Sequence, residues 1–557
     1  MMLAWVKNYR RAWLAGDLAA GAVVAMMMIP QGMAYALVAG LPPVAGIYAS
    51  ILPLLLYALF GTSSSQSVGP MAIISLMTAS ALAPLAAPGT VVYATLAGQL
   101  ALLSGVVLLA CGLLRLGFLA NFFSRPVMNG FTIGSSILIA WDQLGTLLGA
   151  APPHWHGPSA ALGLGALALL VLARRHGSAL LRRCGLPPSA ADIGARLAPM
   201  LVVLGAIAAV ALLGLDRMGV RVIGQVPAGL PHLNLATSGA HWQLLLKPAL
   251  LIGFMCFLLS MSGAQALAAK KGEKLLTNAE LVGLGAANIG SFLSGAFPVT
   301  ASLSRSAVNF SAGANSQLAG VVTALLLGAA LVLPTGWLAL LPLPVLSATI
   351  IVAVLGMLES GTLRTAWRYD RADALALLAT AGGVLLMGVE AGVVVGLLLS
   401  MGAMIWRESR PHIAVLGRIA GTEHFRNVDR YDTETRSGVL LLRVDAGLFF
   451  GNVEAVSARA EEELGQHEGV RELVLVLSAV NAIDTSALFG LLELNATLAQ
   501  RGVRLHLAEV KGPVMDRLKQ STLLERLSGQ VFLSTANAWH ALSSKGDDCQ
   551  DSVGMAI

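Results

Sequence analysis

The chain has 557 residues, of which 56% are hydrophobic and only 12% are charged, and its formal net charge at pH 7 is +6. Soluble domains contain about 25% charged residues, so this composition and a mean hydropathy of +0.75 exclude a soluble protein and indicate a polytopic protein of the lipid bilayer. The basic residues lie in short loops between apolar runs, which membrane topology explains better than a surface for nucleic acid, and no nucleic acid partner is predicted.

The N-terminal residues 1–16 combine basic and apolar side chains but lack the short apolar core and cleavage site of a signal peptide. They are predicted to be a cytoplasmic amphipathic lead-in. Residues 17–406 are predicted to form the transmembrane domain, because apolar stretches of about 20 residues recur along them. Fourteen segments are expected to be membrane helices: 17–40, 44–60, 67–83, 91–114, 126–145, 157–173, 197–214, 246–269, 279–296, 299–311, 317–334, 339–358, 372–387 and 389–406.

The placement of Lys and Arg tests this division. With fourteen spans, most basic residues fall on one side of the membrane, in clusters within 7–11, 115–125, 174–196, 270–274, 364–371 and 407–410. The opposite side receives Arg217, Arg221 and Lys247. Loops rich in Lys and Arg stay in the cytoplasm. The pattern therefore predicts a multi-pass protein of the cell inner membrane with both termini in the cytoplasm.

Two of the segments are short and interrupted. Residues 61–76 (GTSSSQSVGPMAIISL) and 294–308 (SGAFPVTASLSRSAV) both place Ser/Thr and Gly/Pro ahead of a brief apolar helix. They are the third and tenth segments, which are equivalent positions in two seven-helix halves of opposite orientation. Such paired interruptions indicate the midplane site of a transporter, where helix N-termini favour an anion. The alternative is that both are kinked helices whose hydroxyls bond to their own backbone.

Arg305 lies within the second interrupted segment. It is the one Lys or Arg of the membrane part that we place neither at the end of an apolar run nor in a loop. A cation inside a bilayer is costly unless it lines a wet cavity or has a partner. Because no acidic residue is near in sequence, a bound anion is the predicted partner.

The four cysteines are Cys111, Cys184, Cys256 and Cys549. They show no paired or metal-type spacing. No disulfide framework, metal site or cofactor is predicted.

After residue 406 the composition becomes that of a soluble α/β domain. Residues 407–437 are predicted to be a linker with a first strand in HIAVLGRI (412–419), 438–545 a domain, and 546–557 a tail. GVLLLRVDA, RELVLVLSA and VRLHLAEV are predicted strands, and NVEAVSARAEEELGQH, SALFGLLELNATLAQRG and PVMDRLKQSTLLERL are predicted to be helical. Alternating strands and helices favour a βαβ-type domain.

Several long motifs resemble the sulfate permease family: PQGMAYALVAGLPPVAGIYAS (30–50), SVGPMAIISL (67–76), TNAELVGLGAANIGSFLSGAFPVTASLSRSAVNFSAGANSQLAG (277–320) and GVEAGVVVGLLLS (388–400). The C-terminal domain resembles a STAS (sulfate transporter and anti-sigma antagonist) domain. The resemblance covers nearly the whole chain. It implies a seven-plus-seven inverted repeat with core and gate domains, elevator-type transport of a small anion, and a homodimer.

The resemblance also implies which residues bind the anion. They are Gln31 and Tyr35 in QGMAYA, Gly69 and Met71 in SVGPM, Leu259 at the family's glutamate position in the eighth segment, and Ser302, Ser304 and Arg305 in SLSRS. Other interpretations are open for three of them. Gln31 could satisfy backbone groups that Pro30 frees, Tyr35 could be a packing aromatic, and Met71 could fill the core.

Leu259 departs from the pattern of the family. Many members carry at this position a glutamate that can cycle a proton, and leucine cannot do so. The sequence therefore favours exchange or uncoupled transport over proton symport. Asp142, Glu280 and Glu390 are alternative proton carriers, although Glu280 is interpreted first as a helix cap.

In the STAS-like domain, IDTSALFGLLEL (483–494) resembles the loop whose hydroxyl is phosphorylated in related anti-sigma antagonists. Thr485 and Ser486 are the regulatory candidates, and a cytosolic partner could recognise this domain. Asp484, Thr485 and Ser486 also fit an ordinary helix N-cap. His506 is expected to be a surface or edge residue.

The sequence thus predicts a secondary transporter of small inorganic or carboxylate anions, and no enzyme is expected because we find no catalytic constellation. A membrane sensor or motor that binds an anion and signals through the STAS domain is the alternative. A nucleobase permease is a third, and Arg305 and the STAS domain argue against it. The sequence does not select among sulfate, bicarbonate, chloride, nitrate and dicarboxylates.

Overall fold

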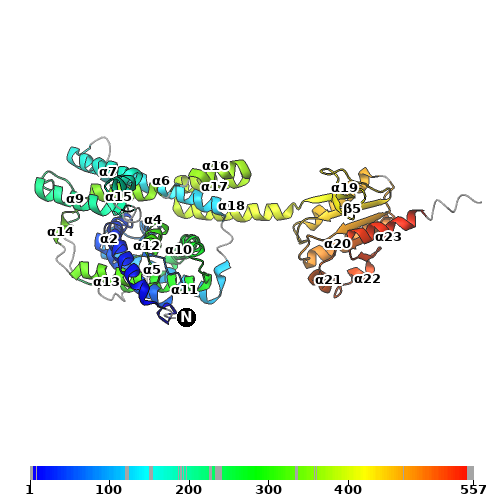
Figure 1. Ribbon diagram of the computed structural model, residues 1–557, viewed down its shortest axis with the longest axis horizontal. Coiled ribbons are helices and arrows are strands. Elements are labelled where there is room, and N and C mark those ends of the chain that lie inside the picture. The colour runs from blue at the N-terminus through cyan, green and yellow to red at the C-terminus, as the bar shows by residue number, and fades with distance from the viewer. Residues whose placement is uncertain are drawn as a thin grey trace, which may run out of the picture. The chain divides into compact units, whose positions relative to one another are not determined.

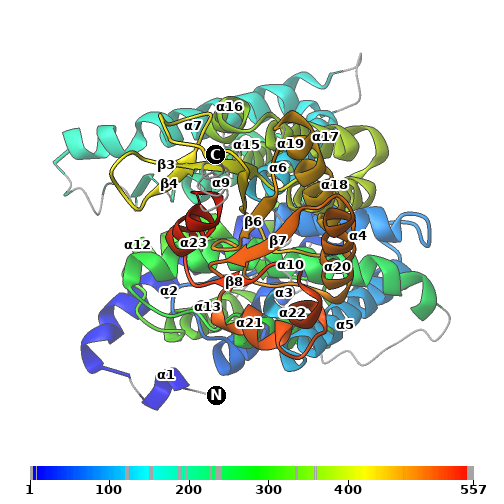
Figure 2. The same cartoon turned by 90° about the vertical axis from the view of Figure 1, so that its right-hand side faces the viewer.

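The computed structural model describes the chain apart from residues 1–3, 8, 119–123, 150–154, 186, 188–190, 192–193, 196, 225–228, 232–240, 333–335, 357, 359, 468 and 548–557. It divides into two compact units, Met1–Ser400 and Met401–Ile557. Figures 1 and 2 show helices in the first unit and a sheet flanked by helices in the second.

In the first unit, each predicted apolar segment coincides with a helix. The first seven are α2 (Leu14–Val38), α3 (Pro43–Phe60), α4 (Ala72–Leu82), α5 (Val91–Leu113), α6 (Arg125–Leu148), α7 (Gly157–Arg183) and α9 (Ala198–Leu213). The next seven are α10 (Trp242–Lys271), α11 (Thr277–Leu293), α12 (Leu303–Ser311), α13 (Leu318–Val332), α15 (Leu343–Leu355), α17 (Arg371–Met387) and α18 (Val389–Ser409). The described part of this unit also contains the short helices α1 (Ala4–Lys7), η1 (Arg11–Trp13), α14 (Gly336–Ala339) and α16 (Ser360–Tyr369).

Within the described residues, six helices are long and apolar enough to cross a membrane by length and composition. These are α2, α3, α5, α6, α7 and α10, and four more apolar helices are shorter. The existence of the helices follows from apolar runs of sufficient length. The number that cross the bilayer and the inverted repeat stay predictions.

The helices α2 and α3 come close together where Gly32 faces Gly46. A Cβ placed on Gly46 would overlap the carbonyl oxygen of Gly32, and one placed on Gly32 would lie 2.9 Å from the carbonyl oxygen of Gly46. Small residues at a crossing let two membrane helices come into backbone contact. This contact fixes α2 at the turn that also carries Gln31 and Tyr35.

Replacing Gly46 by alanine is therefore expected to destabilise the protein by about 2 kcal/mol, because the added methyl forces the two backbones apart. The midpoint of thermal unfolding in detergent measures the effect. The matched control is Gly165→Ala on α7, where an added Cβ meets no atom within 4 Å. That variant should be neutral or slightly stabilised, since alanine favours helix by about 1 kcal/mol over glycine. Equal midpoints for the two variants would contradict the packing argument.

The second unit contains a six-stranded sheet in the order β4-β3-β5-β6-β7-β8. Its strands are β3 (Ile413–Arg418), β4 (Phe425–Asn427), β5 (Val439–Val444), β6 (Glu472–Val476), β7 (Arg504–Ala508) and β8 (Val531–Phe532). The strands from β5 to β8 run parallel, and β3 is antiparallel to β5. The helices are α19 (Val453–Gln466), α20 (Thr485–Gln500), α21 (Gly512–Leu518), α22 (Leu523–Arg526) and α23 (Thr535–Asp547).

This α/β architecture and the strand predicted in 412–419 are confirmed. The helical prediction for 513–527 is wrong in part, because the chain leaves helix between Leu518 and Leu523 and forms two short helices. The strands β5, β6 and β7 and the helices α19 and α20 all supply buried aliphatic side chains to the core of this unit.

The expectation that His506 is a surface or edge residue is wrong. β7 lies between β6 and β8, and the His506 side chain is 2% exposed. Its Nε2 lies 2.7 Å from Glu472 Oε2, and its Nδ1 accepts a hydrogen bond of 3.0 Å from the backbone N–H of Gln530. Both ring nitrogens therefore have partners, as a buried imidazole requires.

Candidate functional site

The two interrupted segments meet as a short β ribbon. β1 (Val68–Gly69) pairs antiparallel with β2 (Thr300–Ala301), with Val68 opposite Ala301 and Gly69 opposite Thr300. The backbone N–H of Ser302 donates to the carbonyl oxygen of Ser67 at 3.2 Å, and the N–H of Ser67 donates to Ser306 Oγ at 3.0 Å. Pro70 and Pro298 keep the preceding backbone extended. The starts of α4 and α12 therefore lie together.

Neither helix start is capped by a side chain. The N-cap of α4 is Met71 and that of α12 is Ser302, and neither side chain accepts a bond from its own helix. The first N–H groups of a helix lack intrahelical partners and carry the positive end of the dipole. Two such ends beside a two-stranded ribbon favour negative charge.

Arg305 sits in the first turn of α12 and is 1% exposed. Its Nη1 donates to the carbonyl oxygen of Pro70 at 2.7 Å, while Nε and Nη2 are buried without a hydrogen-bond partner. A Cβ on Gly69 would lie 3.5 Å from Nη2, so the guanidinium lies beside β1. Among the described residues no carboxylate forms an ion pair with it. The cation is turned into the protein, and two of its donor nitrogens have no partner there.

The other predicted residues differ in how far they are buried. Tyr35 is 7% exposed and close enough to Arg305 for an electrostatic interaction. Met71 is 5% exposed, and Gln31 is partly exposed. Ser302 is buried and Ser304 is exposed, with their hydroxyl oxygens 3.0 Å apart.

Sequence reasoning missed Ser67, whose buried Oγ has no hydrogen-bond partner. The SVGP motif shows that the Ser67 hydroxyl lies just before a helix start, but it does not show that this side chain is buried. It also missed Met28, because a Cβ on Gly69 would overlap the Met28 Cε atom. Met28 thus closes the side of the site that faces α2.

Leu259 is a partly exposed residue of α10, and this helix contacts α4, α12 and β2. The neighbouring Ser260 ties α10 to the ribbon, since its Oγ accepts from the N–H of Ala301 at 3.0 Å and lies 2.8 Å from Thr300 Oγ1. The sequence of α10 contains no Asp or Glu. This helix therefore brings a hydroxyl but no carboxylate toward the ribbon.

The interpretation of Glu280 as a helix cap is wrong. The N-cap of α11 makes no side-chain bond, and Glu280, 1% exposed, instead binds the segment after α3. Its Oε1 accepts from the backbone N–H groups of Thr62 (2.7 Å) and Ser63 (2.8 Å) and from the Thr62 hydroxyl, and its Oε2 accepts from Tyr57 Oη at 2.6 Å. Of the other two acids, Asp142 is exposed, and the Glu390 side chain lies outside the described residues.

In the second unit, Thr485 and Ser486 are exposed in the first turn of α20. The cap is Asp484, whose Oδ1 accepts from the N–H of Ala487 at 2.7 Å and whose Oδ2 accepts from the N–H of Phe450 at 3.0 Å. The two hydroxyls are therefore not needed for the cap. Among the described residues, no group of three or more His, Cys, Asp or Glu could hold a metal ion.

A model of the sulfate permease family matches residues 14–380, and a model of the STAS domain matches residues 430–538. The chain belongs to the sulfate permease family. A probable sulfate transporter of Mycobacterium tuberculosis is 35% identical over 557 residues, covering 96% of each chain. The chloroplastic sulfate transporter 4.1 of Arabidopsis thaliana is 33% identical, covering 95% of this chain and 80% of the plant protein.

Two solved structures share the fold of this sulfate permease family member. The murine solute carrier 26 family member A9 anion transporter in the inward-facing state has a TM-score of 0.87 at 22% identity, covering 97% of this chain and 93% of that one. The transmembrane domain of a cyanobacterium bicarbonate transporter, BicA, has a TM-score of 0.60 at 22% identity, covering 69% of this chain and 98% of that one. The fold is thus a helical transmembrane region followed by a STAS domain.

Proposed function

We propose that this protein is a secondary transporter of small anions, which bind between the N-termini of α4 and α12 beside Arg305. The observation that carries the proposal is the buried guanidinium with two nitrogens lacking partners at the meeting point of two uncapped helix starts. The relatives named as sulfate transporters and the fold shared with a bicarbonate transporter support the same substrate class. The site moves across the bilayer with the core domain, as in an elevator.

Counterflow in proteoliposomes tests this function. Vesicles loaded with unlabelled sulfate should accumulate labelled sulfate, and the ability of bicarbonate, chloride, nitrate and a dicarboxylate to replace the internal anion ranks the substrates. Specific binding without any flux would contradict transport and favour a sensor or motor that signals through the STAS domain. The exposed Thr485 and Ser486 hydroxyls of that domain are its regulatory site in our proposal.

Transport is proposed to occur by exchange or without proton coupling, because Leu259 of α10 stands where the family resemblance implies a glutamate. Leu259→Glu is expected to make uptake rise severalfold when the proton concentration outside exceeds that inside, since a carboxyl group there can carry a proton. Uptake at a fixed and at an imposed pH difference measures this. Leu259→Gln is the matched control and should show no such rise. Uptake by the natural protein that already follows the pH difference would contradict the assignment.

The protein is further proposed to be a homodimer in the inner membrane, with the N-terminal residues 1–16 and the STAS domain in the cytoplasm. The domain limits are those expected from composition, at 17–406 and 438–545. The mass of the detergent-solubilised protein, corrected for bound detergent, tests the dimer.

A further inference from the structure

The ribbon of β1 and β2 has an edge that is covered by side chains. In the part of the chain that the structure describes, the two strands form a sheet by themselves. Backbone groups of a strand point alternately to its two sides, and the N–H of Ser302 points to β1, because it donates to Ser67. Those of Val299 and Ala301 therefore point away from β1. Val299 is 0% and Ala301 is 2% exposed, so their backbone groups need partners within the protein.

Asn288 of α11 is the partner of Val299. Its Oδ1 accepts from the N–H of Val299 at 2.9 Å, and its Nδ2 donates to the carbonyl oxygen of Val299 at 2.9 Å. Nδ2 also donates to the carbonyl oxygen of Leu284 at 2.9 Å. The orientation of the amide is thus fixed, because exchanging its oxygen and nitrogen would place an acceptor against both carbonyl oxygens. The buried amide bonds to Val299 as a residue of a neighbouring antiparallel strand would.

Ser260 of α10 is the partner of Ala301. Its Oγ accepts from the N–H of Ala301 at 3.0 Å and lies 2.8 Å from Thr300 Oγ1. The Thr300 hydroxyl donates to the carbonyl oxygen of Cys256 at 2.8 Å, so the Ser260 hydroxyl is the donor between the two side chains. Two helices thus supply the hydrogen bonds of this edge of β2, α11 through an amide and α10 through a hydroxyl.

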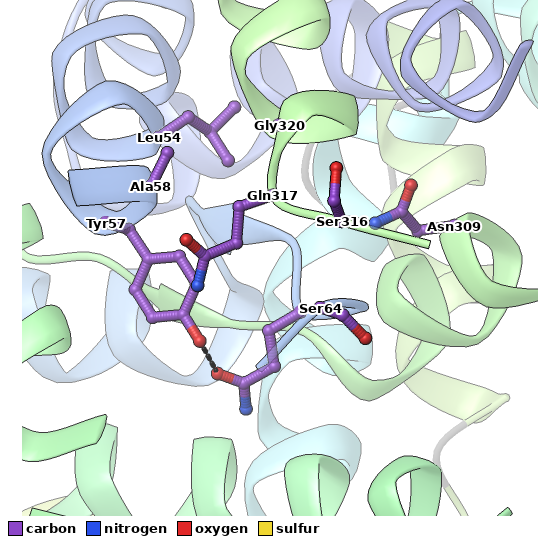
Figure 3. Close-up of a pocket in the computed structure, with 9 residues that line it drawn as sticks. Leu54, Tyr57, Ala58, Ser64, Asn309, Ser316, Gln317 and Gly320 are labelled. Atoms are coloured by element: carbon purple, nitrogen blue, oxygen red, sulfur yellow. Dashed lines mark hydrogen bonds between the residues drawn. The ribbon is translucent and has the colours of Figure 1, made fainter. Parts of the chain in front are cut away.

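The same residue of α10 also holds the segment that leads to β1. Gln66 Nε2 donates to the carbonyl oxygen of Ser260 at 2.6 Å. The amide oxygen of Gln66 lies 2.8 Å from Tyr57 Oη on α3, and the dashed line in Figure 3 marks this hydrogen bond. Both strands of the ribbon are therefore connected to one turn of α10, and Asn288 connects β2 to α11 as well. Side chains of these helices, in the place of a third strand, set the position of β2.

We propose that Asn288 is a positioning residue of the anion site, which sets where α12 begins and hence where the Arg305 guanidinium lies. Arg305 comes four residues after Ala301, and its Nη1 donates to the carbonyl oxygen of Pro70, directly after β1. A displacement of β2 would move the first turn of α12 and change the direction of the guanidinium nitrogens that have no partner. Asn288 acts through the backbone and needs no contact with the anion. This inference rests on the proposed function.

The contact with Val299 needs one acceptor and one donor on the same short side chain. Leucine at position 288 offers neither. An ionised aspartate can accept from the N–H of Val299, but it places a second acceptor against the carbonyl oxygen. A neutral carboxyl group has one acceptor oxygen and one O–H donor and reproduces the pair that the amide makes. An aspartate variant therefore makes the position of β2 depend on pH.

Isothermal titration of the purified full chain with sulfate, repeated from about pH 8 down to about pH 5, tests this role. Asn288→Leu is expected to weaken sulfate binding by about tenfold or more at every pH, because charge-assisted hydrogen bonds weaken steeply when their distance and angle become poor. Asn288→Asp should be as weak at the upper end of the range. Toward the lower end it should approach the affinity of the natural chain at the same pH, because burial disfavours the charged carboxylate.

Asn495 of α20 is the matched control, because it makes the same kind of contact in the second unit. Its Oδ1 accepts from the N–H of Ser528 at 2.9 Å, and its Nδ2 donates to the carbonyl oxygen of Arg526 at 2.8 Å. Asn495→Leu and Asn495→Asp should lower the midpoint of thermal unfolding, since buried backbone groups lose partners. Their sulfate affinity should equal that of the natural chain at each pH. A loss of affinity as large as that of Asn288→Leu would show that lower stability alone weakens binding, and would overturn the positioning role.

Two results of the titrations at position 288 would also overturn the role. One is a natural sulfate affinity in Asn288→Leu, and the other is an Asn288→Asp variant that is as weak as Asn288→Leu at every pH. If Asn288→Leu does not fold, Ser260→Ala gives the decision, because it removes the acceptor of the Ala301 N–H and leaves a small side chain. It should weaken sulfate binding by about threefold or more, and an unchanged affinity would contradict the proposal.

Arg305→Ala separates this inference from the proposed function. If Arg305→Ala loses sulfate binding while Asn288→Leu and Ser260→Ala keep it, the anion site stands and the positioning role is wrong. If Arg305→Ala binds sulfate as the natural chain does, the proposed anion site itself is wrong.

Discussion

Arg305→Ala is expected to weaken sulfate binding by at least about a hundredfold and to stop counterflow. Hydrogen bonds to charged groups contribute about 1.5–3 kcal/mol each, and this guanidinium keeps two nitrogens without partners beside the ribbon. Losing two such bonds amounts to about 3–6 kcal/mol, which corresponds to a factor of more than a hundred. Isothermal titration of the detergent-solubilised protein with sulfate measures the affinity, and labelled sulfate counterflow measures transport.

The variant should still fold, because Arg305 makes one hydrogen bond within the described structure, to the carbonyl oxygen of Pro70. Arg174→Ala is the matched control. Its guanidinium also donates to backbone carbonyl oxygens, those of Val352 and Gly356, but it is exposed and belongs to another part of the unit. Arg305→Lys should bind sulfate with intermediate affinity, since it keeps the charge and loses the planar fork. Unchanged sulfate affinity in Arg305→Ala would remove the central argument for this site.

The paired helix starts could be predicted from the sequence because their signal is local. Gly69-Pro70 and Pro298 disfavour helix, and the Ser and Thr residues around them need hydrogen-bond partners. Each interruption can therefore be predicted from the residues of its own segment. The pairing of β1 with β2 joins residues more than two hundred positions apart. It could be inferred only by comparing the two halves of the chain, and its register could not be inferred at all.

The role of Glu280 shows why other parts of the site could not be predicted. A carboxylate in the first turn of a helix is usually explained by the helix dipole, and that local rule gave the wrong partner. The donors come from Thr62 and Ser63, 218 and 217 positions away. The burial of His506 could not be predicted either. It depends on the order of the strands in the sheet, and the sequence of a single strand does not reveal that order.

The hydrogen bonds of three buried amide side chains could not be predicted from the sequence either. Gln66, Asn309 and Gln317 lie in segments rich in Ser, Gly and Asn, where polar residues ordinarily face water or turns. Only the structure shows that their NH₂ groups donate to backbone carbonyl oxygens of distant segments. Two of these residues, Asn309 and Gln317, stand within the segment that carries Arg305 and the turn that follows it.

Replacing Glu280 by leucine is expected to destabilise the protein by about 3 kcal/mol or more and to weaken sulfate binding at the same time. The backbone N–H groups of Thr62 and Ser63 would lose their acceptor, and each unsatisfied buried donor costs about 1–3 kcal/mol. The midpoint of thermal unfolding and a sulfate titration measure the two effects.

The segment 61–66 that Glu280 holds leads directly into β1 and α4, and this connection is why one side chain on α11 affects both stability and affinity. Glu273→Leu is the comparison, because Glu273 also accepts a hydrogen bond from this segment, at Ser64, but with a side chain that is 42% exposed. Its loss should change stability by less than about 1 kcal/mol. Glu280→Gln should lie between the two, since an amide oxygen can still accept from one backbone N–H. If Glu280→Leu lowered stability but left sulfate affinity intact, the position of α4 would not depend on this segment, and the anion site would owe its geometry to the β ribbon alone.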